Sequence, residues 1–214
     1  KLGYRYIETD VQASADGAVF VFHDDELSRL TDGEGVIAAL PSSDVRQARI
    51  HGAEPLMTLE EMFETFPQTR FNIDIKSDEA LEPTLALVEK MGVLDRVCLA
   101  SFSGRRLARI GQRFGPAVCL SAGPRDVTAL KFASWRMPLM RSAAQCAQVP
   151  VKEYGIEIPT RRFVEHCNAR GVAVHVWTID EEDEMRRLIR LGVNGRMTDR
   201  PSLLKKVARE EGVW

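Results

Sequence analysis

The sequence predicts an α/β fold of the TIM (β/α)8-barrel type, distorted in its first strands. Segments with strand patterns alternate with segments of helical spacing along the 214 residues, which is the order that produces a parallel sheet covered by helices. Several predicted helices end at a glycine, as helices commonly do: Gly92, Gly115, Gly171 and Gly192. No glycine-rich nucleotide-binding motif follows the first strand, which disfavours an open doubly wound sheet.

The beginning of the chain has the pattern of a hairpin. Residues 4–11 have a strand pattern, and the apolar, β-branched and aromatic run AVFVF at residues 18–22 ends at His23. The segment ADG at residues 15–17 is a turn signal between the two runs. We therefore expect two neighbouring strands between Tyr4 and His23.

The rest of the chain continues the alternation. Thr58 and Glu61 match a capping box at the start of a helix expected over residues 58–66. Prolines interrupt any regular pattern between Trp135 and Glu157, notably Pro138 and Pro150, so the number of strands there stays open. Further strands are expected over residues 70–76, 97–102, 117–123, 172–179 and 195–199, and further helices over residues 80–91, 104–114, 125–133, 160–170, 181–191 and 201–211.

Composition narrows the class of protein. With 44% hydrophobic and 28% charged residues the chain has the make-up of a soluble globular protein. Its formal net charge of −2 and interleaved charges offer no basic patch for nucleic acid or an acidic membrane. No apolar stretch approaches the ~18 residues needed to cross a bilayer. These features predict neither a nucleic-acid partner nor a transmembrane segment.

The cysteines indicate a reducing compartment. The four cysteines are Cys98, Cys119, Cys146 and Cys167, and none of them forms a CxxC pair or has zinc-finger spacing. Cys98 and Cys119 lie within apolar runs. Such residues are most simply reduced thiols in or near the core. We therefore expect a cytoplasmic protein.

Charged side chains end three successive predicted strands. Glu8 and Asp10 are two residues apart, so their carboxylates point to the same side of one strand. Asp74 and Lys76 share one side of a later strand in the same way, and His23 ends the apolar run between them. Barrel enzymes build their sites at the carboxyl ends of their strands. The pattern therefore indicates an active site.

Each of these residues alone is also explained by an exposed strand edge, a cap or a loop. The combination is not, because burying the charges unpaired would cost several kcal/mol. A bound divalent cation would relieve the repulsion among Glu8, Asp10 and Asp74, and all-oxygen ligation favours Mg²⁺ or Ca²⁺ over zinc. A cation beside Lys76 and His23 suits a phosphate ester: the cation and the lysine neutralise its oxygens, while the histidine moves a proton.

The order of short motifs resembles the glycerophosphodiester phosphodiesterase family of the PLC-like phosphodiesterase superfamily. The motifs are IETDV, a DG turn, VFVFHDDELSRLTDGEG, LMTLEEMFETF, FNIDIK, LASFS, VHVWTID and GVNGRMTDRPSLL, and they span nearly the whole chain. The resemblance implies one barrel domain over residues 1–214. It also implies metal-dependent hydrolysis of glycerophosphodiesters to glycerol 3-phosphate and an alcohol, an activity of lipid metabolism.

The resemblance assigns roles to individual residues. It makes Glu8 and Asp10 metal ligands. Asp74 lies where many members have the glutamate of an EIK motif; the side chain is shorter here, but a carboxylate is retained and we keep it as a ligand.

The remaining roles concern substrate and catalysis. The resemblance makes His23 one of two catalytic histidines, of which one activates the nucleophile and the other protonates the leaving alkoxide. It places Lys76 against the substrate phosphate and Trp177 in the lining of the pocket. The substrate is then a small-molecule glycerophosphodiester, and a homo-oligomer is compatible with the sequence.

Two motifs of the family are absent from this sequence: an opening strand with His-Arg-Gly and a loop with Glu-Asn, which supply the other histidine, an arginine and a further metal-ligating glutamate. Residues 4–11 also form a strand without a lead-in. We therefore expect a barrel without its first strand, an N-terminally incomplete domain, and weak or no activity of this chain alone. A closed barrel would instead point to His175 as the second histidine.

Two other functions stay open. The chain could be a lysophospholipase D-like hydrolase of lipid head groups, which would act on a lysophospholipid but not on glycerophosphocholine. Alternatively, it could be a catalytically dead barrel that serves as a binding module.

Overall fold

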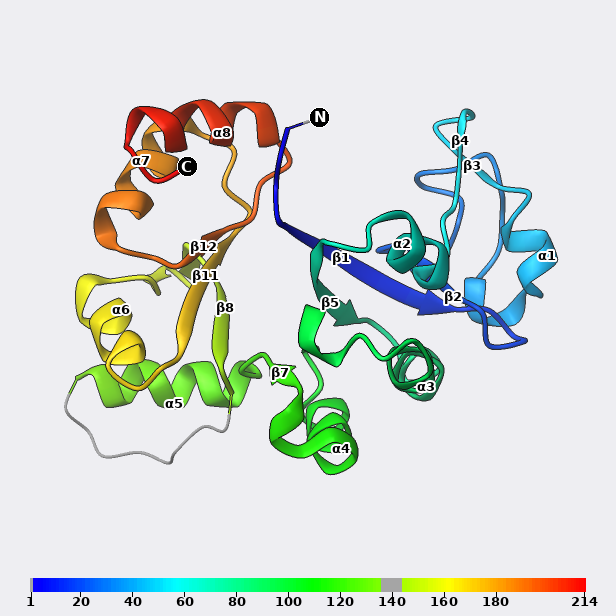
Figure 1. Cartoon of the computed structure of the whole chain (residues 1–214), viewed down its shortest axis with the longest axis horizontal. Coiled ribbons are helices and arrows are strands. Elements are labelled where there is room, and N and C mark those ends of the chain that lie inside the picture. Colours follow the sequence, from blue (N-terminus) through cyan, green and yellow to red (C-terminus); the bar gives the residue numbers. More distant parts are fainter. Residues whose placement is uncertain (1, 136–143) are drawn as a thin grey trace. The chain divides into compact units, whose positions relative to one another are not determined.

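The computed structural model describes residues 2–135 and 144–214, so Pro138 lies outside the described residues. The chain forms two compact units (Figure 1). One consists of Tyr4–Cys119, and the other consists of Leu120–Trp214 together with the first three residues.

The unit Tyr4–Cys119 is built on a sheet with the strand order β2-β1-β5-β6-β7. The parallel pairs are β1 with β5 and β5 with β6, as expected for an α/β protein. Over residues 6–9, β1 pairs among the described residues with β5 alone. The strands are β1 (Tyr6–Ala13), β2 (Val19–Val21), β5 (Arg70–Ile75), β6 (Val97–Ala100) and β7 (Cys119–Leu120).

The predicted hairpin at the start of the chain is confirmed. β1 and β2 pair antiparallel with Val11 opposite Val21. The ADG turn joins them, and Gly17 adopts a φ of +84°, a conformation that glycine permits at no steric cost. The turn is closed by the Gly17 amide, which donates to the Ser14 carbonyl over 2.9 Å.

The segment between β2 and α2 packs around a small core of its own. This cluster consists of the buried residues Phe20, Phe22, Leu27, Ile37, Val45, Ala48 and Leu56. Each large apolar side chain buried in this way contributes about 1.5–3 kcal/mol. The segment contains η1 (Ile37–Ala39), α1 (Ser42–Val45) and the short hairpin β3 (Arg49–Ile50) and β4 (Glu54–Pro55).

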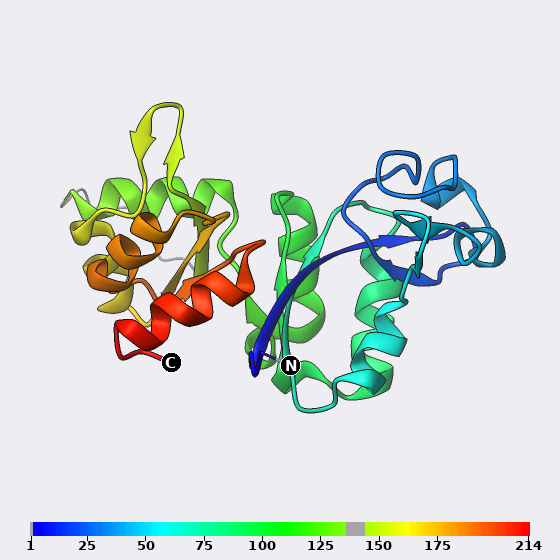
Figure 2. The same ribbon diagram turned by 90° about the horizontal axis from the view of Figure 1, so that it is seen from above.

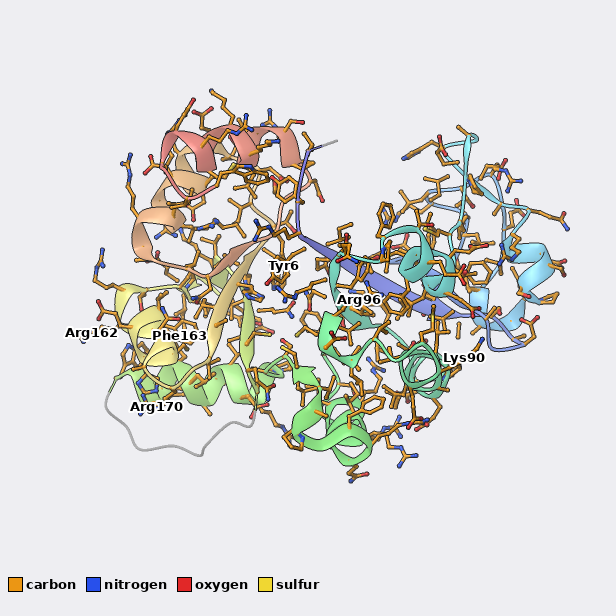
Figure 3. All side chains as sticks on the ribbon, viewed as in Figure 1. Tyr6, Lys90, Arg96, Arg162, Phe163 and Arg170 are labelled. Carbon is orange, nitrogen blue, oxygen red and sulfur yellow. The ribbon has the colours of Figure 1, made fainter. Side chains whose placement is uncertain are left out.

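Helices of this unit begin and end close to the predicted residues. The capping box of α2 is present, because the Thr58 side chain accepts from the Glu61 amide and Glu61 accepts from the Thr58 amide. Arg96, labelled in Figure 3, lies over the rings of Phe63 and Phe71. The remaining elements are α2 (Leu59–Thr65), α3 (Leu81–Met91), η2 (Leu94–Arg96), α4 (Gly104–Phe114) and η3 (Gly115–Ala117).

The second unit contains a three-stranded sheet of order β12-β11-β8, with β11 parallel to both neighbours. The strands are β8 (Cys146–Pro150), β11 (Ala173–Trp177) and β12 (Gly195–Arg196), and the helices are α5 (Pro124–Ser134), α6 (Arg161–Asn168), α7 (Glu182–Leu191) and α8 (Pro201–Glu210). A hairpin of β9 (Lys152–Glu153) and β10 (Ile156–Glu157) projects from this unit (Figure 2).

The number of strands between Trp135 and Glu157 stayed open in the sequence. In the structure the described part of this stretch forms β8 and the hairpin of β9 and β10. The strand expected over residues 117–123 is reduced to Cys119–Leu120. The ladder pairings of the described residues form separate sheets and no closed ring. In the part of the chain that the structure describes, no helix has the length and apolarity that crossing a membrane requires.

Candidate active site

Asp10 and Asp74 face each other on neighbouring parallel strands. They are register partners in the β1–β5 pair, so their side chains leave the sheet on the same side. The Lys76 Nζ lies 2.9 Å from Asp10 Oδ1 and 2.9 Å from Asp74 Oδ2. One ammonium group therefore bridges two carboxylates at the carboxyl end of the paired strands.

Asp74 has the most buried carboxylate of this group. Its side chain is 8% exposed, and Asp74 Oδ1 is buried without a hydrogen-bond partner among the described residues. A buried acceptor without a hydrogen-bond partner destabilises the folded protein by about 1–3 kcal/mol, and by more when it is charged. A divalent cation would satisfy this oxygen, and carboxylate oxygens are the ligands that hard cations prefer. The donor set therefore fits a cation of this kind.

Glu8 is the third carboxylate of the cluster. The residue keeps part of its surface exposed, but the surrounding protein desolvates the carboxyl group and raises its pKa to about 7. The negative charges of Asp10 and Asp74 add to the rise, and the positive charges of Lys76 and His23 oppose it. The three predicted carboxylates thus influence one another at one site.

Lys76 is held as a cation. Partial burial by itself lowers the pKa of Lys76, but its hydrogen bonds to Asp10 and Asp74 outweigh this and leave the pKa above the ordinary value. The ammonium also lies 5.7 Å from the centre of the Phe102 ring. Phe102 follows β6 and was not predicted as part of the site, although it lies within the quoted LASFS motif.

The β1–β2 hairpin brings His23 to the carboxylates. Beyond the last register pair, the Phe22 amide donates to the Asp10 carbonyl over 3.0 Å. The buried Gln12 side chain donates to the His23 carbonyl over 3.3 Å. The histidine backbone is therefore fixed to β1, and the ring is near enough to Glu8 to act on its pKa.

Two residues that sequence reasoning missed hold the ring of His23. Its Nδ1 lies 2.6 Å from Asp24 Oδ1. Arg29 forms two hydrogen bonds to the same carboxylate. Its Nη2 donates to Asp24 Oδ1 over 2.8 Å, and its Nε donates to Asp24 Oδ2. The sequence signal was present, since an acidic and a basic residue follow the histidine within six positions, but charges in such a loop are commonly solvated.

The structure does not place every predicted residue in this cluster. Trp177 ends β11 in the second unit, where it is half-buried, and its role in the pocket stays a prediction. His175 lies on the same strand against Gly195 of β12, where a Cβ on the glycine would come within 2.7 Å of the imidazole Cδ2. This close packing explains a glycine at position 195.

Comparison with known proteins identifies the family. The model of the glycerophosphoryl diester phosphodiesterase family matches residues 1–203. A Mycobacterium tuberculosis protein named "Probable glycerophosphodiester phosphodiesterase 2" is 37% identical, over 100% of this chain and 83% of the relative. A glycerophosphodiester phosphodiesterase of Caldanaerobacter subterraneus is 30% identical, over 99% and 89%. A lysophospholipase D of Rattus norvegicus is 24% identical, over 96% and 77%.

Solved structures show the fold. A glycerophosphodiester phosphodiesterase of Parabacteroides distasonis has a TM-score of 0.77 and 19% identity, covering 99% of this chain and 86% of that one. An Oleispira antarctica phosphodiesterase, solved in complex with the product sn-glycerol-3-phosphate, has a TM-score of 0.78 and 21% identity, covering 97% and 86%. These likenesses show the mixed α/β fold of TIM-barrel-type proteins.

The family match and the whole-length relatives agree with the motif order read from the sequence. Members of the family are phosphodiester hydrolases that generally depend on a divalent metal. The chain belongs to the glycerophosphoryl diester phosphodiesterase family.

Proposed function

We propose that the protein hydrolyses glycerophosphodiesters to glycerol 3-phosphate and an alcohol with the help of Mg²⁺ or Ca²⁺. The observation that carries this proposal is the cluster in which Lys76 bridges Asp10 and Asp74, with Glu8 and His23 beside them. Membership of the family and the names of the relatives support the same reaction.

Glu8, Asp10 and Asp74 would hold the cation. The buried Asp74 Oδ1, which has no hydrogen-bond partner among the described residues, supports this assignment. So does the pKa of Glu8, which desolvation raises and the charges of Asp10 and Asp74 raise further. When bound, the ion supplies positive charge next to the phosphate, which polarises it for attack by a nucleophile. Oxygen ligands favour Mg²⁺ or Ca²⁺ over metals that prefer nitrogen or sulfur.

Lys76 and His23 complete the chemistry of the site. Lys76 is held as an ammonium by two carboxylates and can neutralise a phosphate oxygen, where fixed positive charge stabilises the transition state more than the ground state. In hydrolysis a new bond forms between the water oxygen and phosphorus while the bond from phosphorus to the alcohol oxygen breaks. His23 either takes the proton from the water or gives one to the leaving oxygen.

A direct assay tests the proposal. The protein is incubated with a panel of glycerophosphodiesters that differ in the alcohol, including glycerophosphocholine and glycerophosphoethanolamine. Release of glycerol 3-phosphate is followed with Mg²⁺, with Ca²⁺ and with excess chelator. We expect release, weak for this chain alone, with at least one cation and none with chelator. A complete lack of release under all conditions would contradict the proposal.

The second candidate is hydrolysis of lysophospholipid head groups. The lysophospholipase D of Rattus norvegicus favours it, because that relative matches 96% of this chain. A lysophospholipid in the same panel separates the two functions. Release of the head group from the lysophospholipid, with no turnover of glycerophosphocholine, would favour the second candidate.

A third possibility is a binding module without catalysis, which would bind glycerol 3-phosphate without releasing it from any diester. We also propose a cytoplasmic location. The cysteines support it, because none of the four forms a disulfide bond among the described residues, and such thiols persist in reducing compartments.

A further inference from the structure

His23 is the first of three side chains connected by hydrogen bonds. The imidazole Nδ1 lies 2.6 Å from Asp24 Oδ1, and Arg29 binds both oxygens of the same carboxylate. Arginine and carboxylate in this two-pronged arrangement form one of the stronger and more directional pairs in proteins. The carboxylate is therefore fixed in orientation, and the ring that it binds is fixed with it.

The charge of Asp24 decides which ring nitrogen of His23 is reactive. The hydrogen bonds from Arg29, and then the one from His23, hold the pKa of the Asp24 carboxyl well below its usual range, so Asp24 only accepts. A neutral imidazole beside an accepting carboxylate carries its proton on Nδ1. The Nε2 of His23 can then accept a proton at the substrate and, once the ring is protonated, donate one.

The exposure of His23 and Arg29 argues against a purely structural role. The side chains of His23 and Arg29 are 60% and 63% exposed, and that of Asp24 is 16% exposed. Exposed ion pairs contribute little to folding. The backbone at His23 is already held by Gln12 and by the hairpin. The Arg29–Asp24 pair therefore adds little to the fold and mainly orients the ring.

We propose that Arg29 is a positioning residue for His23 and that it acts through Asp24. The inference rests on the proposed function, in which His23 transfers a proton. Arg29 itself makes no step of the reaction. It keeps Asp24 turned toward Nδ1, and the carboxylate in turn keeps the imidazole in the tautomer and orientation that leave Nε2 available.

Kinetics of single variants give the first test. Arg29→Ala in the full chain should lower kcat by roughly 10- to 100-fold, because a misplaced catalytic group costs about that much. KM should stay within about twofold, since Lys76 and the cation site are untouched. Arg46→Ala is the matched control, because Arg46 forms an exposed ion pair with Glu61 over 2.8 Å in the same unit. The control variant should keep its kcat.

A double-mutant cycle asks whether Arg29 acts through His23. In the background of His23→Ala, the further change Arg29→Ala should alter kcat by less than about twofold, because the ring to be oriented is gone. If Arg29→Ala leaves kcat unchanged on its own, or lowers it equally with and without His23, the positioning role is wrong.

A nitrogen NMR measurement of the His23 ring separates this inference from the proposed function. The neutral wild-type ring should carry its proton on Nδ1, and Arg29→Ala should give a mixture of tautomers. If the wild type hydrolyses no glycerophosphodiester, the proposed function fails, and the same tautomer shift still supports the positioning role. A wild-type ring protonated on Nε2, or a ring unchanged in Arg29→Ala, overturns it.

Discussion

Asp10 on β1 and Asp74 on β5 are register partners in adjacent parallel strands. Two carboxylates at such a position repel each other, and in the folded protein the Lys76 ammonium lies between them at 2.9 Å from each. The fold therefore concentrates negative charge at the place where we propose that a phosphate ester binds. In the proposed site Lys76 and a bound cation offset this repulsion, and the behaviour of the site on losing either of them can be predicted.

Replacing Lys76 by methionine should affect both stability and catalysis. Lys76→Met leaves Asp10 and the largely buried Asp74 without their ammonium partner, so the chelated protein should lose about 1–3 kcal/mol of unfolding free energy. Adding a divalent cation should therefore stabilise Lys76→Met against unfolding by more than it stabilises the wild type. Activity should fall by about 10²–10³-fold. Urea unfolding with chelator or cation and steady-state kinetics measure these effects.

Lys90→Met provides the control for this variant. Lys90, labelled in Figure 3, pairs with Glu60 over 2.8 Å, and both side chains are exposed. Losing this pair should cost less than about 1 kcal/mol. Equal effects of the two methionine variants on stability and activity would show that the bridge at the carboxylates has no special role.

His23→Ala should lower kcat by roughly 10²–10⁴-fold, the usual contribution of a general acid or base. The melting temperature should hardly change, because the side chain is 60% exposed. Kinetics and thermal unfolding of the same preparation check both parts. A variant that is less stable but keeps its turnover per folded molecule would make His23 a structural residue.

The turn of the β1–β2 hairpin should make a pH-dependent contribution to stability. Asp16 accepts from the Ser14 and Ser42 hydroxyls over 2.6 and 2.7 Å, and these bonds lower its pKa from 3.8 to about 2. Because the pKa is lower in the folded state, the stabilisation is present above about pH 4 and is lost as the pH falls toward 2. Asp16→Asn should therefore destabilise the protein at neutral pH and have little effect near pH 2.

Urea unfolding of wild type and Asp16→Asn at about pH 6 and about pH 2 measures this difference. Ser42→Ala, which removes one of the donors, should show a smaller effect of the same sign. A loss of stability in Asp16→Asn that is equal at the two pH values would rule out the ionised carboxylate as its cause.

Local patterns were sufficient to predict most elements. The Thr58 capping box and the glycine that follows α3 set helix ends through backbone chemistry that is visible in the sequence: Gly92 adopts a φ of +64°. The carboxylate cluster was predictable for a similar reason. Alternation along a strand puts Glu8 and Asp10 on one side, and parallel pairing brings Asp74 beside them.

Other features depend on contacts between segments that are distant in sequence. The small core around Phe20 and Leu56 is built by short turns without periodicity, so no pattern in the sequence predicts it. β8 contains Gln148 and ends at Pro150, and neither residue marks a strand. Arg29 reaches His23 through Asp24 only because a turn folds the arginine back onto that carboxylate. No pattern of residue types predicts such a turn.

The affinity for a divalent cation tests the central claim most directly. Calorimetric titration of the metal-free protein with Mg²⁺ and with Ca²⁺ should show one site, and Asp74→Asn should weaken it at least about tenfold, because one charged ligand is lost. The control variant Lys90→Met should bind like the wild type. An Asp74→Asn protein that is folded and binds the cation as tightly as the wild type would contradict the claim that Glu8, Asp10 and Asp74 hold one ion.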